Sequence, residues 1–182
     1  VEQYAREAMQ LSEQTGDQKL LAKSLASLGL VQQARPEDLA EAKRNLEASV
    51  EISRREGYKE SSSQSMSFLG LQAYWQGHFK RAVSLGQEGL AVSRDIHDGF
   101  HELLTLGNLA FANWGVGDYG KAFRILHDGI RVAIERNNWF GAGRMMNTLG
   151  WLHSEFGDVA HAIEYDQESA ELGRAYRISN VE

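Results

Sequence analysis

Four short segments of this 182-residue chain contain residue types from which a metal site, an active site or a phosphate-binding loop could be built. The first holds His97, Asp98 and His101, which bring two imidazoles and one carboxylate close together in the chain. A closed metal site needs four ligands in fixed geometry. This segment straddles the expected end of a helix and offers no further obvious ligand. We therefore expect no metal site here.

The second segment, His153, Ser154 and Glu155, contains the residue types of a hydrolase triad. Adjacent residues on a helix point in different directions, so these three side chains cannot meet. The other two segments are glycine-containing stretches at 86–89 and 141–143. They lack the strand, the lysine and the spacing of phosphate-binding loops. The sequence thus predicts no catalytic residue and no cofactor, and we expect a protein that is not an enzyme.

Composition excludes other classes of function. The formal net charge is −6 and no basic stripe is visible, which argues against direct binding of nucleic acid. There is no cysteine, so disulfides and cysteine-ligated metals are excluded. No apolar run reaches the roughly 18 residues that span a bilayer, so we expect no membrane segment and a cytoplasmic location. The single proline fits an almost wholly helical chain.

The elements that would position any site come from one unit repeated along the chain. Gly77, Gly117 and Gly157 are 40 residues apart, and several further columns keep the same step. Within each unit the apolar residues recur at helical spacing. We predict a helix over 2–15, followed by four helix pairs: 18–34 with 37–56, 58–76 with 79–96, 99–115 with 119–136, and 139–156 with 159–176.

Two features of the repeat predict backbone geometry. The unpaired helix ends at Gly16, and the second helices of the first three pairs end at Gly57, His97 and Asn137. These residue types tolerate the left-handed conformation, whereas Arg177, at the end of the last pair, departs from this column. Small residues recur inside both helices, which predicts close approach of the backbones. One column, Gly29, Gly70, Ala110 and Gly150, should face Ala42, Ala82, Ala122 and Ala162. The other, Ser49, Gly89, Gly129 and Ser169, should receive the next pair.

The motif Met66-x-x-Leu69-Gly70, followed by Gly77-x-Phe79-x-x-Ala82, resembles the tetratricopeptide repeat, and two further copies follow it in register. The resemblance implies an all-α superhelical solenoid of about nine antiparallel helices. It divides the single domain 1–182 into an unpaired helix at 1–16 and repeats at 17–57, 58–97, 98–137 and 138–177. The repeat is 40 rather than 34 residues long, and Gln32, Ala73, Asn113 and His153 replace a customary aromatic residue.

The long period is similar to the repeat arrays of bacterial signalling proteins. Those arrays often follow a regulatory ATPase, a nucleotide cyclase or a LuxR-type DNA-binding module, as in the activator of the maltose regulon. The resemblance therefore implies a fragment of a larger signalling or transcription regulator, whose first helices line a concave binding face.

On that face the exposed columns include Leu30/Leu71/Phe111/Trp151 and Gln33/Tyr74/Trp114/Ser154. These aromatic side chains either pack between neighbouring first helices or anchor a ligand in a groove. The expected ligand-binding residues are Leu71, Tyr74, Trp75, Phe111, Trp114, Arg144, Asn147 and Trp151.

We expect a module that binds a protein, a peptide or a neighbouring domain of the same protein. The alternative is a sensor of a small molecule such as an oligosaccharide, stacked on Tyr74, Trp114 and Trp151 beside Arg144 and Asn147. Exposed apolar ends of the array would also favour self-association.

Overall fold

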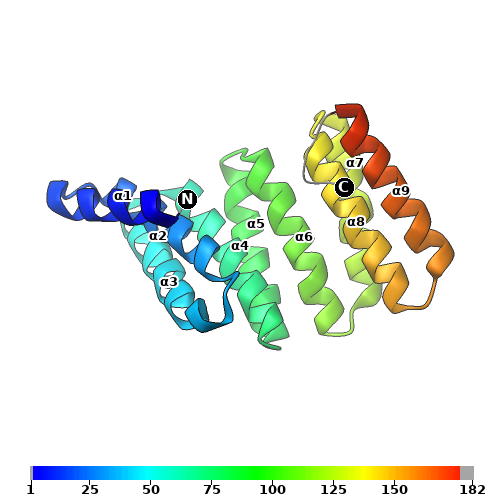
Figure 1. The fold of residues 1–182 in the computed structure, drawn as a ribbon, viewed down its shortest axis with the longest axis horizontal. Coiled ribbons are helices and arrows are strands. Elements are labelled where there is room, and N and C mark those ends of the chain that lie inside the picture. The colour runs from blue at the N-terminus through cyan, green and yellow to red at the C-terminus, as the bar shows by residue number, and fades with distance from the viewer. Residues whose placement is uncertain (1, 177–182) are drawn as a thin grey trace. The chain divides into compact units, whose positions relative to one another are not determined.

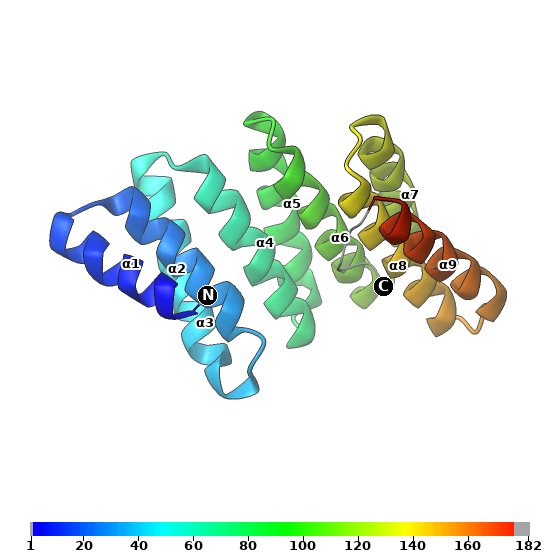
Figure 2. The same cartoon turned by 45° about the horizontal axis from the view of Figure 1, so that its top comes forward.

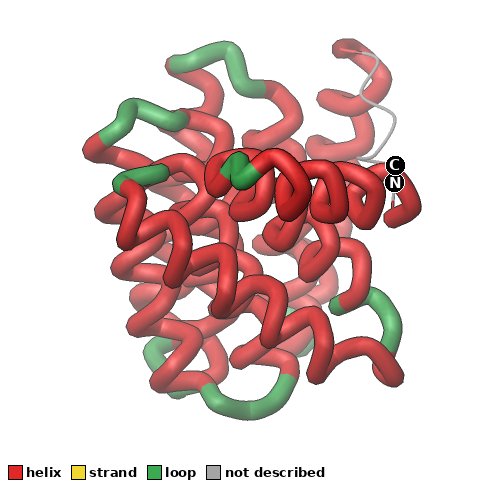
Figure 3. Tube along the Cα trace, turned by 90° about the vertical axis from the view of Figure 1, so that its left-hand side faces the viewer, coloured by secondary structure: helices red, strands yellow, loops and turns green. Residues whose placement is uncertain are grey.

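The computed structural model describes residues 2–176, which form α-helices joined by short turns (Figures 1 and 3). The predicted all-α solenoid is confirmed, while the expected end of the last repeat at Arg177 lies outside the described residues. No described helix combines the length and apolarity needed to cross a bilayer. The helices are α1 (Glu2–Thr15), α2 (Gln18–Gln32), α3 (Leu39–Glu56), α4 (Lys59–Trp75), α5 (Phe79–Asp95), α6 (Gly99–Gly115), α7 (Tyr119–Glu135), α8 (Trp139–Glu155) and α9 (Val159–Tyr176).

The predicted helix bounds differ most from the structure at the turn between α2 and α3. The expected helices were 18–34 and 37–56, but α2 ends at Gln32, and a 3₁₀ turn, η1 (Pro36–Asp38), precedes α3. Proline disfavours the helical conformation for the residue before it, and Arg35 is extended, with φ −117° and ψ 122°. The chain therefore leaves the helix earlier here than in the other hairpins, whereas α3 begins at the position equivalent to the first residue of α5.

The described residues form two compact units, 2–105 and 106–176, which divide within α6. In the first unit α1 to α5 pack in chain order, each against the next, and α2 also contacts α4. Figure 2 shows this succession of antiparallel helices. In the second unit α7 packs against α8 and α8 against α9. In both units, therefore, most of these contacts join helices that are consecutive in the sequence.

The turns have the backbone conformation that the repeat predicts. Gly16, Gly57, Gly77, Gly117 and Gly157 have positive φ angles between 72° and 84°. At the two equivalent positions without glycine, His97 has φ 57° and Asn137 has φ 53°. These two residues confirm that the position, and not only the glycine, requires the left-handed conformation.

The predicted close approach between the two helices of a pair is also confirmed. A Cβ atom added at Gly29 would lie 3.0 Å from the carbonyl oxygen of Ala42, and one added at Gly150 would lie 3.0 Å from that of Ala162. Both distances are too short for an ordinary contact. The α2–α3 and α8–α9 hairpins therefore need glycine opposite alanine, whereas the α6–α7 hairpin accommodates Ala110 at the same position.

The second column of small residues, which was expected to receive the next helix pair, also forms hydrogen bonds within its own pair. Ser49 Oγ donates to the carbonyl oxygen of Ala22 within its own hairpin at 2.8 Å and also accepts from Ser65 Oγ of the next helix at 2.8 Å. Ser169 Oγ donates to Gly143 O of its own hairpin at 3.0 Å. The column therefore joins the two helices of a pair as well as successive pairs.

We predict that His97→Gly stabilises the protein. Left-handed backbone costs a non-glycine residue about 1–2 kcal/mol, and the greater freedom of glycine in the unfolded chain offsets part of this gain. We expect the free energy of unfolding to rise by about 0.5–1 kcal/mol in chemical denaturation. Asn137→Gly should gain less, because asparagine tolerates this conformation better. A loss of stability in His97→Gly would contradict the assignment of strain to this turn.

A pair of glycine-to-alanine variants tests the helix crossing. At Gly29 the added methyl group meets Leu46 Cγ at 2.5 Å and backbone at 3.0 Å, so Gly29→Ala should lower the free energy of unfolding by about 1–3 kcal/mol. At Gly107, inside α6, the described residues place no atom within 4 Å of the added group apart from the backbone of the same helix and the two flanking residues. Gly107→Ala should therefore raise stability by about 0.5–1 kcal/mol through helix propensity. Equal effects in thermal denaturation would rule out close approach as the cause.

Candidate binding site

The first unit contains an open cavity between the C-terminal ends of α2 and α4 and the turn that follows α2. Its volume is about 360 Å³, within the range of small-ligand and peptide pockets. None of its lining residues is charged. They are Leu30, Gln33, Ala34, Pro36, Leu39, Leu71, Gln72, Trp75 and Gln76.

The apolar walls of the cavity are partly open to solvent. Trp75 is 68% exposed and Leu30 is 39% exposed, while Leu71 is half-buried and less exposed than either. Large apolar side chains that gather around a concave surface are typical of a binding site, whereas single exposed ones are ordinary. The cavity is thus suited to an apolar group of a partner.

The cavity lies where the first hairpin lacks an aromatic pair that the α4–α5 and α6–α7 hairpins have. In the α4–α5 hairpin the ring of Tyr74 packs on Phe79 with centroids 5.6 Å apart. In the α6–α7 hairpin Trp114 packs on Tyr119 at 4.7 Å. The corresponding residues beside α2 are Gln33 and Leu39, which line the cavity instead. Two smaller side chains and the proline turn leave this space open.

Gln72 contributes a polar group to the cavity. Its side chain is only 3% exposed, and its Nε2 donates a 2.6 Å hydrogen bond to the carbonyl oxygen of Leu39. Its Oε1 is buried and accepts no hydrogen bond from the protein. A buried acceptor without a donor costs about 1–3 kcal/mol, so a ligand that supplies an N–H or O–H group would gain by pairing with it.

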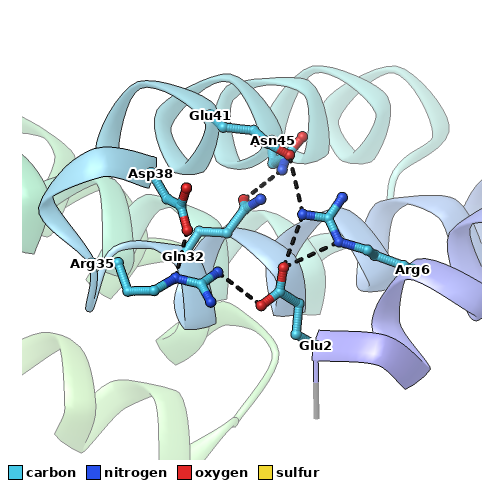
Figure 4. A network of polar contacts seen from close by, with 7 residues as sticks. All are labelled: Glu2, Arg6, Gln32, Arg35, Asp38, Glu41 and Asn45. Atoms are coloured by element: carbon cyan, nitrogen blue, oxygen red, sulfur yellow. Dashed lines mark hydrogen bonds and ion pairs between the residues drawn. The ribbon is translucent and has the colours of Figure 1, made fainter.

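A network of polar side chains holds the turn beside the cavity (Figure 4). Glu2 of α1 forms ion pairs with Arg35 at 2.7 Å and with Arg6 at 2.8 Å, and Arg35 also pairs with Asp38 at 2.5 Å. The hydrogen bonds from Arg35 and then Arg6 lower the pKa of Glu2. The network ties α1 to the turn that contains Pro36.

The same network explains one departure from the repeat motif. Gln32, which is fully buried, accepts a 2.7 Å hydrogen bond from Asn45 of α3 through its Oε1 (Figure 4). It stands where the resembled family has an aromatic residue. In the second unit Asn113, also buried, donates to Leu109 O at 2.7 Å. Polar side chains at this position are thus satisfied in part by hydrogen bonds near the hairpin end.

The expected ligand-binding residues of the first unit are brought to two different places. Leu71 and Trp75 line the cavity. Tyr74 packs on Phe79 at the hairpin junction and meets the edge of Trp75, with ring centroids 5.0 Å apart. Trp75 therefore faces the candidate site, and Tyr74 supports it from behind.

In the second unit the expected aromatic residues form a cluster. Phe111 packs on Trp151 at 5.4 Å, and Trp114 lies 6.1 Å from Trp151 and 4.9 Å from Phe156. The rings pack on one another, as the core interpretation required. They are not sealed, because Trp151 is 36% and Phe156 is 55% exposed. The cluster therefore has features of both interpretations.

Arg144 and Asn147, the expected polar ligands of a sugar, contact other residues. The guanidinium of Arg144 lies 5.9 Å from the ring centroid of Phe140, one turn earlier on α8. Asn147 Nδ2 lies 3.5 Å from Asp166 Oδ1 of α9. These contacts lie outside the cluster of Phe111, Trp114 and Trp151, so they give the sugar hypothesis no support.

Sequence reasoning missed Gln72 and Leu39. A signal for Gln72 was present, because its column otherwise contains Val31, Ala112 and Leu152, which are all apolar. A polar residue at a buried repeat position is unusual. Leu39 could not be identified as part of the cavity, because its role depends on the shape of the α2–α3 turn.

The segment around His97 has a local structural role. Asp98 accepts hydrogen bonds from the backbone N–H of His101 at 3.1 Å and from its ring Nδ1 at 2.5 Å. This is the geometry of a helix N-cap. His153 contacts Asp158 at 3.0 Å, whereas Ser154 and Glu155 are exposed.

Exposed apolar side chains occur on both α1 and α9. Tyr4 and Leu11 are more than half exposed on α1, and so are Val159 and Ile163 on α9. Self-association through these helices remains a prediction.

Comparison with known proteins shows the fold alone. No family model matches the sequence, and no curated protein matches it. Aspartyl phosphate phosphatase F from Bacillus subtilis superposes with a TM-score of 0.74 at 15% identity, over 88% of this chain and 42% of that one. The chain thus spans less than half the length of that protein.

Two structures of nearly identical TPR-like repeats, described as a kinesin light chain from Podosopora anserina, are also similar. They superpose with TM-scores of 0.61 and 0.58, both at 18% identity and over 97% of this chain. They cover 96% and 97% of those chains, respectively. The fold is therefore that of TPR-like helical repeats, as the sequence motif indicated.

A pH prediction follows from the cap of α6. Burial raises the pKa of Asp98, but the hydrogen bonds from His101 outweigh it and hold the pKa below the ordinary 3.8. A lowered pKa stabilises the fold above the ordinary value, and this contribution is lost as pH falls through the folded-state value. Asp98→Asn should therefore lower Tm at pH 7, and its difference from the wild type should shrink as the pH falls below the ordinary 3.8 and through the lowered folded-state pKa. A difference that persists unchanged in acid would show that charge is not involved.

Proposed function

We propose that this chain is a non-enzymatic interaction module that binds a polypeptide segment in the cavity between α2 and α4. The observation that supports this most directly is the combination of exposed Trp75 with the unpaired, buried Oε1 of Gln72 in one uncharged cavity. Trp is the residue type most enriched in binding hot spots. A peptide supplies both an apolar side chain and backbone N–H donors.

The chemistry of the cavity favours a bulky, uncharged side chain of the partner. A cavity of about 360 Å³ accommodates one or two such side chains against Leu30, Leu71 and Trp75. The lining carries no cation, so it does not favour a partner that binds through a carboxylate. A backbone N–H beside the inserted side chain would donate to Gln72 Oε1.

The broader context is also part of the proposal. The TPR-like fold and the 40-residue repeat support a protein-interaction scaffold within a larger bacterial signalling or transcription regulator in the cytoplasm. In that setting the bound segment belongs to another protein or to a neighbouring domain of the same one. Phosphatase activity belongs to the named relative and is not part of this proposal.

A second candidate is an oligosaccharide bound at the aromatic cluster of the second unit. The partial exposure of Trp151 and Phe156 favours it, because sugar rings stack on accessible aromatic side chains. The positions of Arg144 and Asn147 weigh against it. A Trp151→Ala variant distinguishes the two candidates.

We predict that Trp75→Ala and Leu71→Ala each weaken peptide binding by roughly tenfold or more, since each removes apolar contact area in the cavity. The probe is a peptide selected on the full chain from a random display library, and affinity is measured by fluorescence anisotropy. Gln72→Met should also weaken binding while the protein keeps its fold, because it removes only the polar group.

The matched controls are Tyr4→Ala, an exposed aromatic residue on α1, and Trp151→Ala in the second unit. Both should bind the selected peptide with unchanged affinity. Equal binding by the wild type and Trp75→Ala would refute the cavity as the site. If only Trp151→Ala loses binding, the peptide binds at the aromatic cluster of the second unit and not in the cavity.

A further inference from the structure

The turn between α8 and α9 brings together three metal-ligating side chains that are distant from the cavity in sequence. His153 lies in the last turn of α8, Asp158 precedes α9, and His161 lies in the first turn of α9. Asp158 Oδ2 lies 3.0 Å from Nδ1 of His153 and 2.7 Å from Nδ1 of His161. One ligand atom from each of the three residues lies within 4.8 Å of the others.

The fold holds this arrangement in place. Gly157 adopts φ 76°, and the backbone N–H of Asp158 donates to the carbonyl oxygen of His153 at 2.9 Å, which sets the carboxylate beside that imidazole. The ring of His153 stacks on Tyr165 at 5.4 Å and meets the edge of Phe123 at 5.0 Å. The least exposed ligand is therefore oriented by packing before any ion binds.

A comparison within the chain shows what is special about this turn. Asp98 and His101 have the same spacing and the same Nδ1-to-carboxylate contact as Asp158 and His161. Such a pair is explained fully as a helix cap. At the α8–α9 turn a second imidazole, His153, approaches the same carboxylate oxygen from another helix. Capping gives no reason for this third side chain.

We propose that His153, Asp158 and His161 bind a divalent transition-metal ion of the zinc class, with water completing its coordination. Two imidazoles and one carboxylate form a ligand set that such ions prefer, and zinc sites of three protein ligands and a water are common. In a tetrahedral site with bonds of about 2.0–2.1 Å the ligand atoms lie roughly 3.3 Å apart. The two Nδ1-to-Oδ2 distances, 3.0 Å from His153 and 2.7 Å from His161, are already near that separation.

The site would link two helices. His153 belongs to α8 and His161 to α9, so a bound ion would cross-link the hairpin and stabilise the folded state by mass action. Asp158 gives the site one negative charge when both imidazoles are neutral, which favours a cation. The inference does not depend on the proposed peptide cavity, which lies in the first unit.

The test is a titration of the full chain, freed of metal with a chelator, with zinc chloride in isothermal calorimetry. We expect saturable binding of one ion per chain and a rise in Tm. His161→Gln and His153→Gln should each weaken zinc binding by roughly tenfold or more, because each removes a ligand. His161 is 58% exposed, so His161→Gln should fold normally, which circular dichroism checks.

The matched control is His101→Gln, which breaks the corresponding Asp–His pair of α6 and should leave zinc binding unchanged. Magnesium chloride should give no saturable heat, since magnesium prefers oxygen ligands. Either of two results would overturn the proposal: no saturable zinc binding by the wild type, or equal affinities for the wild type and His161→Gln.

Discussion

The structure depends on the close approach of the two helices within each hairpin. Gly29 and Gly150 lie against the carbonyl oxygens of Ala42 and Ala162, where a single added carbon atom would meet backbone at 3.0 Å. Backbone cannot move aside as a flexible side chain can, so the crossing point fixes how each pair of helices sits. Once this point is fixed, the side chains at the hairpin end have a defined space to fill. The candidate site is a consequence of how they fill it.

Most of the architecture could be predicted from the sequence because it is set by short-range rules that recur. The repeat located the helices to within a few residues and identified His97 and Asn137 as left-handed turns. The exception was the turn at Pro36. This turn is one residue longer than the others, and it contains a proline, which has no backbone N–H, in place of the usual glycine. A repeat pattern predicts the average unit, and it fails where one unit differs in length.

The site was less predictable, because core packing and ligand binding place the same residue types at the same helical spacing. The aromatic columns gave no means to decide between these roles. In the structure the rings of Trp114 and Tyr119 fill their hairpin junction, whereas Gln33 and Leu39 leave theirs open. The cavity thus lies where two aromatic side chains of the middle hairpins are absent. Neither residue attracts notice by its own chemistry, so only the arrangement of neighbouring elements shows the space.

Departures from the repeat are therefore more informative about function than the repeat itself. Gln72 occupies a buried column that Ala112 and Leu152 fill with apolar atoms, so the fold does not need an amide there. Its Nε2 gains a hydrogen bond to the turn, but its unpaired Oε1 costs about 1–3 kcal/mol. The net contribution of the hydrogen bond from Nε2 to stability is about 1 kcal/mol, which is no larger than the cost of the unpaired Oε1. A partner that donates to Oε1 would remove the penalty, so the side chain gains most in the bound state.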